Sequence, residues 1–424
     1  MAKIHVERMM HRSSIAVSGE SAVSYALVKL IPTGLGAKPM GLNIALCLDV
    51  SGSMYEEDGT GVSRLKRIQD AALSAIRKLK PDDTLTIVAF AHDAVVLLPP
   101  TPISDMAAIE KCIQNIDRCD VDPGGTSMDE GMKLALDEVE KLESGKLSQV
   151  LILTDGETSG ERTCRELAQR AADKKIHLTL MGVGLDWKAS LIKDLAKISQ
   201  GKWYYIDVNN AEDTERVFDE EFQSLAASAF LDVEMHLRPM KDVRIKRIRQ
   251  VVPDIKELTP TEPEERHLVA QLGTLTDQSV RYVLDLGLPK RADGKYVVAQ
   301  MEITYDAGTG VRESSGPIAL EMTYTAAGHG YVNAEVARHI DEVQIFELNN
   351  NLQQAITTNN ATEVQRVAQE IERKGNLMGP RAAKKTMLAR QVLTELNAGG
   401  RVSKKTQLAM EDSARLAEEM PTGN

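Results

Sequence analysis

Oxygen-bearing side chains occupy alternate positions in the segment that follows the first long apolar run of the chain. Asp49, Ser51 and Ser53 are spaced two residues apart, with Gly52 between the two serines. A short loop at the end of a strand turns alternate side chains toward one point. One carboxylate and two hydroxyls form a hard ligand set, which favours Mg²⁺, with Mn²⁺ and Ca²⁺ as alternatives, over a soft metal.

Two later segments supply the oxygen donors that such a site still needs, because three protein groups leave an octahedral ion incomplete. Thr126 ends the loop motif PGGT, and Asp155 lies in TDGE directly after another apolar run. Taken singly, each motif is more typical of a turn or a helix cap. Their order along a strand–helix pattern predicts one metal site, with the ligands Asp49, Ser51, Ser53, Thr126 and Asp155.

Together the motifs DVSGSM, GGT and LILTDGE resemble the metal-ion-dependent adhesion site (MIDAS) of von Willebrand factor type A (VWA) domains. The resemblance covers residues 42–229, and the segment 182–206 is similar to the last third of bacterial members. It implies that the two serines bind the metal directly and that Asp49 and Asp155 act directly or through water. Thr126 joins in the ligand-competent arrangement, and a partner protein supplies an Asp or Glu to the remaining position.

The ligand chemistry favours recognition over catalysis. Two hydroxyl ligands donate no negative charge, so the ion stays electrophilic and attracts an anion. No residue of the motifs is placed as a general base beside a nucleophile, so we expect no enzyme activity. His92 is expected to be an ordinary surface residue. We predict a partner-binding rim formed by Glu56, Glu57, Asp58, Gly125 and Glu157.

The acidic part of this rim allows two interpretations. The loop that follows Ser53 is longer than is typical of the family before the first helix, and it carries three consecutive carboxylates at 56–58. These carboxylates either tune the metal affinity and repel acidic partners or simply form a solvated acidic loop.

The elements that position these residues are predicted to form an α/β domain. Short apolar strands alternate with amphipathic helices over 42–229, which predicts a doubly wound, mostly parallel, Rossmann-like sheet. Several strands, such as 43–48, are continuous apolar runs, which suits a sheet covered on both faces. Ligands bind such sheets at the carboxyl ends of the strands, where Asp49 lies.

The flanking sequence has a different pattern. Residues 230–328 read as an antiparallel β-sandwich, which we expect the strands of 1–41 to complete, so that the α/β domain is an insertion. Residues 329–424 read as a helical region. These flanking parts resemble bacterial cytoplasmic proteins distantly related to inter-alpha-trypsin inhibitor heavy chains.

Composition narrows the classes of partner. The 424 residues predict two or three domains. A net charge of −11 and 4% aromatic residues argue against binding to nucleic acid or an anionic membrane through overall charge. We see no signal peptide, no apolar run of membrane-spanning length and no CxxC pair, so we expect a cytoplasmic location.

One local charge asymmetry departs from this acidic average. Residues 373–405 hold nine Lys or Arg residues and one acid, Glu395. The stretch either binds an acidic partner or RNA, or offsets the acidic remainder of the same molecule.

We therefore expect a non-enzymatic, metal-dependent protein-binding module or scaffold. The resemblance implies a multi-protein complex with a MoxR-type AAA+ ATPase or a kinase/phosphatase signalling system. Two alternatives are a metal-dependent hydrolase, with Glu157 or the 56–58 loop as acid or base, and an RNA-associated scaffold that uses 373–405.

Overall fold

The structure is a computed structural model, and it describes residues 3–17, 22–34, 41–57, 60–142, 146–199, 201–207, 210–399 and 401–415. The chain divides into two compact units. We call residues 36–231 with 308–310 the α/β unit, and residues 1–35, 232–307 and 311–424 the sandwich unit.

A six-stranded sheet forms the centre of the α/β unit, in the order β6-β5-β4-β7-β8-β9. All neighbouring strands are parallel except β6, which pairs antiparallel with β5 at the edge. The predicted fold class, an α/β fold with a mostly parallel sheet and C-terminal helices, is confirmed. The strand bounds are β4 Leu42–Asp49, β5 Thr84–Phe90, β6 Ala94–Pro102, β7 Leu147–Thr154, β8 His177–Val183 and β9 Lys202–Ile206.

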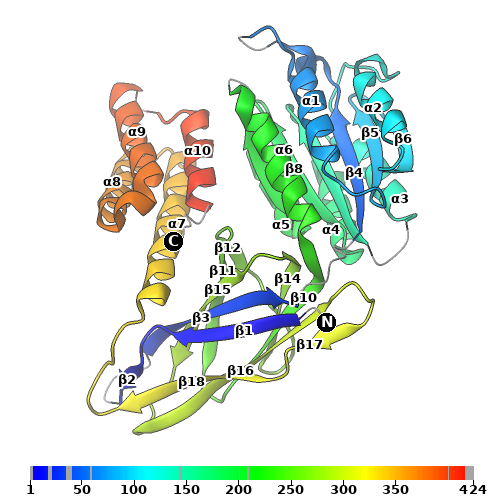
Figure 1. The fold of residues 1–424 in the computed structure, drawn as a ribbon. Helices are drawn as coiled ribbons and strands as arrows, with labels where there is room; N and C mark the ends of the chain where they lie inside the picture. The colour runs from blue at the N-terminus through cyan, green and yellow to red at the C-terminus, as the bar shows by residue number, and fades with distance from the viewer. Residues whose placement is uncertain are drawn as a thin grey trace. The chain divides into compact units, whose positions relative to one another are not determined.

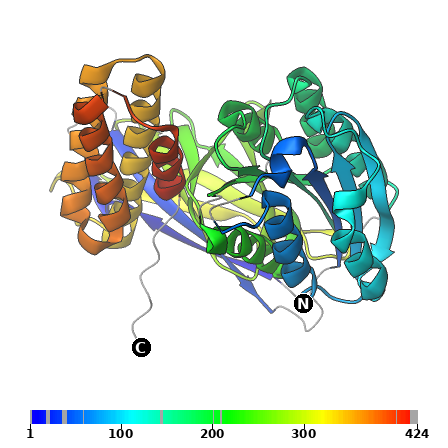
Figure 2. The same cartoon turned by 90° about the horizontal axis from the view of Figure 1, so that it is seen from above.

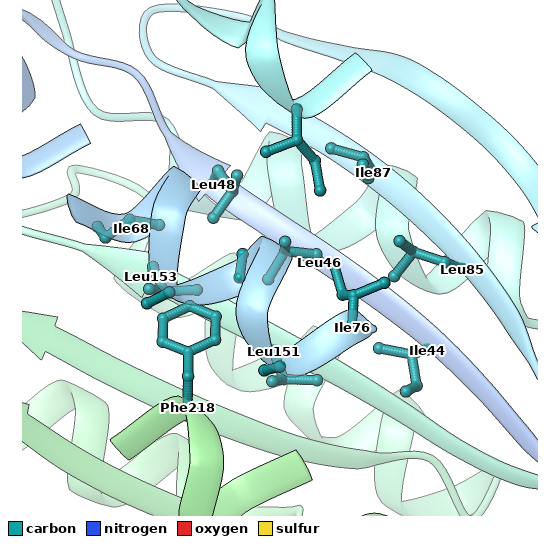
Figure 3. Close-up of a cluster of buried hydrophobic side chains, with 14 of the residues drawn as sticks. Ile44, Leu46, Leu48, Ile68, Ile76, Leu85, Ile87, Leu151, Leu153 and Phe218 are labelled. Atoms are coloured by element: carbon teal, nitrogen blue, oxygen red, sulfur yellow. The ribbon is translucent and has the colours of Figure 1, made fainter. Parts of the chain in front are cut away.

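Helices cover both faces of this sheet, as the continuous apolar strands predicted. Their bounds are α1 Arg64–Ile76, α2 Met106–Gln114, α3 Met128–Val139, α4 Glu161–Asp173, α5 Ala189–Ile198 and α6 Ala211–Ala226, with short 3₁₀ turns at Gly52–Tyr55 and Ile116–Arg118. One face packs against α1, α2 and α6 through a single apolar cluster. Figure 3 shows part of it: Ile44, Leu46, Leu48, Ile68, Ile76, Leu85, Ile87, Leu151, Leu153 and Phe218.

The opposite face packs closely against α3. A Cβ atom on Gly131 would lie 2.7 Å from Cδ1 of Phe90 and 2.9 Å from Sγ of Cys47, so only a residue without a side chain fits there. Successive residues of a strand point to opposite faces, so Cys47 faces α3 while its neighbours Leu46 and Leu48 face α1 and α6. This contact holds the start of α3 near the carboxyl ends of β4 and β5.

A buried carboxylate ties α6 to the sheet. Glu221 accepts hydrogen bonds from the hydroxyl of Thr179 (2.6 Å), from Nζ of Lys202 (2.9 Å) and from the hydroxyl of Tyr204 (3.0 Å). Burial alone would raise the pKa of Glu221, but the Lys202 ammonium and these hydrogen bonds lower it below its ordinary value.

The sandwich unit holds two mostly antiparallel sheets, in the orders β1-β3-β15-β11-β12 and β13-β14-β10-β16-β18-β2, with β17 beside β16. The N–H of Ile4 in the first sheet donates to the hydroxyl of Tyr305 in the second (3.4 Å). The strands are β1 Lys3–Met10, β2 Ser14–Ala16, β3 Ala22–Thr33, β10 Ser228–Pro239, β11 Arg244–Val252, β12 Lys256–Leu258, β13 Thr261–Glu264, β14 His267–Thr276, β15 Val280–Leu288, β16 Gly294–Asp306, β17 Arg312–Ser314 and β18 Ile318–Thr325.

In the described part of the sandwich unit, four helices follow the strands: α7 Ala334–Thr357, α8 Ala361–Met378, α9 Ala383–Gly399 and α10 Lys404–Arg415, with a 3₁₀ turn at Gly379–Ala382. The first half of α7 packs on the first sheet, where Val336, Ile340 and Val343 contact the apolar cluster around Leu27 and Val283. Its second half joins α8, α9 and α10 in a second apolar cluster. Figures 1 and 2 show these helices side by side, from yellow-orange to red.

The close contact of α3 can be tested with Gly131→Ala. We expect the variant to lose about 1–3 kcal/mol of unfolding free energy, because the methyl group overlaps Phe90 and Cys47. Urea denaturation measures the change. The matched control is Gly399→Ala, in a helix where no atom lies within 4 Å of the added carbon; it should gain slightly, because alanine favours helix over glycine. An unchanged midpoint for Gly131→Ala would contradict the packing described.

The Glu221 network predicts a pH-dependent stability. Because the folded-state pKa of Glu221 is lowered, its ionised form contributes stability that is fully present above its unfolded pKa of about 4.3 and is lost as the pH falls below that value. Glu221→Gln should therefore cost about 1–3 kcal/mol at neutral pH, with the difference from the natural chain shrinking below about pH 4.3. Urea denaturation across this pH range gives the difference.

The neighbouring Glu220 provides the control for this experiment. Its side chain is about half exposed and pairs with Arg216 one helical turn earlier. Glu220→Gln should change the unfolding free energy by less than about 0.5 kcal/mol at every pH. A cost for Glu221→Gln that does not vary with pH would argue against an ionised carboxylate in the network.

Candidate functional site

The predicted ligands lie where two adjacent parallel strands end. β4 and β7 pair in register, with Leu48 opposite Leu153, so both strands deliver their next residues to the same edge of the sheet. From β4 the chain runs through α1 to β5 on one side and later returns to β7 on the other side. This position is the topological switch point of the sheet, where doubly wound folds bind their ligands.

The first loop curls around its own aspartate. The N–H of Ser51 donates to Oδ1 of Asp49 (2.9 Å), and the hydroxyls of Ser51 and Ser53 lie 3.3 Å apart. The residues Gly52–Tyr55 form a 3₁₀ turn, and the N–H of Gly52 donates to the carbonyl of Pro123 (3.1 Å). The first and second predicted loops are therefore joined through the backbone.

The loop after β7 is joined to the first loop through side chains. The hydroxyl of Thr154 donates to Oδ2 of Asp49 (2.7 Å), and the hydroxyl of Ser53 donates to Oδ1 of Asp155 (2.7 Å). A hydrogen bond thus joins each aspartate to a residue about a hundred positions away in the sequence.

Thr126 stands at the start of α3, against the same loop. Its Oγ1 lies 3.0 Å from the position that a Cβ on Gly156 would take, which places it beside Asp155. Within the described residues this hydroxyl has no hydrogen-bond partner. The structure therefore brings all five predicted ligand residues, from three loops, to one place.

The two carboxylates at this place are buried. Asp49 is fully buried and Asp155 is 1% exposed. Burial raises the pKa of Asp49 to about 6, although the hydrogen bonds from Ser51 and Thr154 act in the opposite direction and favour the ionised form. A buried carboxylate is stable only where positive charge or hydrogen-bond donors compensate for the lost water.

A cation of the chain itself provides part of this compensation. Nη1 of Arg64, the first residue of α1, lies 2.7 Å from Oδ2 of Asp155, and its Nη2 lies 3.0 Å from Oε2 of Glu56. The Arg64 side chain is 15% exposed, whereas that of Glu56 is 64% exposed. Arg64 thus connects a buried ligand candidate to the surface.

The predicted rim is only partly described. Glu57 and Glu157 are exposed, Glu57 forms a backbone bridge with Ser63, and Asp58 lies outside the described residues. Gly125 lies against the exposed His92, whose Nδ1 is 3.3 Å from the position of a Cβ on that glycine. The predicted surface position of His92 is confirmed, and it borders the rim.

The residues present fit a hard divalent cation. The site offers hydroxyl and carboxylate oxygens, which are the ligands that Mg²⁺ and Mn²⁺ prefer. The described residues contain no cluster of three or more His, Cys, Asp or Glu side chains able to hold a metal. The predicted ligand set differs from such a cluster because three of its five members are hydroxyls.

Sequence analysis missed two residues that contact the ligands. Thr154, the first residue of the TDGE motif, bonds to Asp49, and only the pairing of β4 with β7 makes this visible. The position of Arg64 in the sequence did indicate that it has an acidic partner. A cation in the first turn of a helix opposes the helix dipole, so a partner for it was to be expected.

The basic stretch 373–405 is partly paired within its own unit. Nζ of Lys374 lies 3.1 Å from a carboxylate oxygen of Asp341, and Nε of Arg390 lies 2.7 Å from one of Glu372. These contacts favour the interpretation that the stretch offsets acidic residues of the same molecule.

No helix in the described part of the chain has the length and apolar character needed to cross a bilayer.

Residues 44–157 match the family model of the von Willebrand factor type A domain, and this range includes all five predicted ligand positions. The chain thus contains a VWA domain. The protein sll0103 of Synechocystis is 32% identical over 270 residues, covering 62% of this chain and 61% of that protein. YfbK of Escherichia coli is 23% identical over 201 residues, covering 46% and 33%. The chain thus spans about three fifths of the first relative and a third of the second.

Two solved structures share the fold over nearly the whole chain. A von Willebrand factor type A protein from Catenulispora acidiphila superposes with a TM-score of 0.77 at 16% identity, covering 98% of this chain and 97% of that one. The ArnB paralogue VWA2 from Sulfolobus acidocaldarius gives a TM-score of 0.54 at 15% identity, with 98% of both chains covered. The shared architecture therefore extends beyond the α/β unit.

Proposed function

We propose that this protein is a non-enzymatic, metal-dependent protein-binding module or scaffold. Asp49, Ser51, Ser53, Thr126 and Asp155 would hold Mg²⁺, with Mn²⁺ or Ca²⁺ as alternatives. The bound cation would supply a Lewis acid that accepts a carboxylate oxygen from an Asp or Glu of the partner. One observation carries the proposal: two buried carboxylates and three hydroxyls from three separate loops converge at the switch point of a VWA domain.

The surroundings of the site favour binding over hydrolysis. The rim carboxylates Glu57 and Glu157 are exposed to solvent. General acid–base catalysis is instead favoured by a group held within hydrogen-bond reach of the reacting atoms. The hydroxyls are neutral, so this ligand set carries less negative charge than a set made of carboxylates. A bound dication would therefore attract an external anion more strongly. The partner classes we propose are a MoxR-type AAA+ ATPase or a kinase/phosphatase system in a cytoplasmic complex.

Metal uptake is the first test. Purified protein should bind Mg²⁺ and Mn²⁺ in isothermal titration calorimetry, and Asp49→Ala should weaken binding by about 100-fold or more, since even outer-shell changes cost 10–100-fold. Mg²⁺ at a hundred times its Kd should add about 2.7 kcal/mol of stability to the natural chain. The matched control is Asp93→Asn, an exposed carboxylate just after β5, which should leave uptake unchanged. A folded protein that takes up no divalent ion would contradict the proposal.

Partner capture is the second test. Proteins retained by the immobilised chain in Mg²⁺ should be released by EDTA, because the metal joins the two carboxylate-bearing surfaces, and should not be retained by Asp49→Ala. Mass spectrometry with and without EDTA identifies them, and Asp93→Asn again serves as the control. Capture that survives both EDTA and Asp49→Ala would exclude a metal-bridged interface.

A further inference from the structure

The first turn of α1 carries an unusual charge distribution. The first four residues of the helix include three cations, Arg64, Lys66 and Arg67, and no acidic residue. The N-terminus of a helix has partial positive charge, so cations there are destabilising unless they are paired. Lys66 pairs with Asp70 one turn later (2.6 Å). Arg64 pairs in the opposite direction, with the candidate ligand Asp155.

The backbone fixes Arg64 in this position. Its N–H donates to the carbonyl of Glu56 (3.2 Å), and a bridge between Glu57 and Ser63 closes the intervening loop. The guanidinium then reaches both Asp155 and the side chain of Glu56. Since the Asp155 side chain is fully buried, Arg64 is the charged group that compensates for its burial in this arrangement.

We propose that Arg64 competes with the divalent cation for Asp155 and thereby sets the metal affinity of the site. The inference rests on the proposed function, because it assigns a role at the same site. Oδ1 of Asp155 already accepts from Ser53, and Oδ2 accepts from Arg64. A metal that uses Asp155 must displace or share one of these donors. The guanidinium charge also repels a dication at this short range.

Glu56 gives the displaced guanidinium a second acceptor. It already contacts Nη2 of Arg64 while Nη1 contacts Asp155, so the arginine can release the aspartate without losing its other carboxylate partner. Glu56 is mostly exposed and therefore holds Arg64 more weakly than the buried Asp155 does. In this arrangement the acidic loop acts on metal affinity through Arg64.

The test measures Mn²⁺ affinity and ion-free stability separately. Arg64→Met should bind Mn²⁺ about tenfold more tightly in calorimetry, as expected for loss of one close charge competitor. The ion-free variant should unfold at a lower temperature than the natural chain, because Asp155 is left without its cation. Lys66→Met removes the same charge from the same helical turn without touching Asp155, so it should change Mn²⁺ affinity by less than about twofold.

A double-mutant cycle tests the role of Glu56. In the natural background, Glu56→Gln should weaken Mn²⁺ binding, because the guanidinium is then left to Asp155 alone. In the Arg64→Met background the same change should have almost no effect on Mn²⁺ affinity, because the guanidinium through which Glu56 acts is missing. Equal effects in both backgrounds would show that Glu56 acts directly on the ion and would overturn this part of the inference.

Further outcomes separate the failure of this inference from that of the proposed function. No Mn²⁺ uptake by the natural chain or by any variant overturns the proposed function itself. Uptake that Arg64→Met leaves unchanged or weakens overturns only the role of Arg64. If Arg64→Met does not fold, Arg64→Lys keeps the charge but not the planar two-carboxylate contact. Its Mn²⁺ affinity should then exceed that of the natural chain, and an equal or lower affinity overturns the inference.

Discussion

The structure of the site follows from one constraint, the burial of two carboxylates at the ends of adjacent strands. Asp49 and Asp155 lose nearly all contact with water, and buried charge is costly unless donors or cations replace the hydration. Their side-chain donors come from three segments: Ser53 from the first loop, Thr154 from β7 and Arg64 from α1. The N–H of Ser51 in the first loop also donates to Asp49. The hydrogen bonds that compensate the two buried carboxylates therefore also join these segments to one another.

Contacts with two helices of the α/β unit support this edge of the sheet. α3 packs onto the strands through Gly131, which holds the loop that ends in Thr126 against the end of β4. On the other face α6 is tied to β8 and β9 through Glu221. Binding sites built on rigid strands and helices hold their ligand groups more accurately than sites on free loops. These contacts hold the proposed hydroxyl ligands in place at the edge of the sheet.

The same two carboxylates can be compensated in two ways, by a cation of the chain or by a cation from solution. Arg64 is the cation of the chain that contacts Asp155. Its backbone N–H donates to the carbonyl of Glu56, so the acidic loop positions the arginine. Within this loop, the side chain of Glu56 contacts the arginine. The acidic loop therefore joins the site through the arginine at its end, a role that its composition alone does not reveal.

The parallel α/β framework and the position of the predicted ligand residues at strand ends were predictable from sequence, because both are encoded locally. Continuous apolar runs indicate strands covered on both faces, and a polar loop after each run marks the strand's end. Only the tertiary structure decided which distant groups meet. The contacts of Thr154 with Asp49 and of Arg64 with Asp155 join residues 105 and 91 positions apart. Such contacts depend on the order of strands in the sheet and on the entry angle of α1, and local periodicity contains neither.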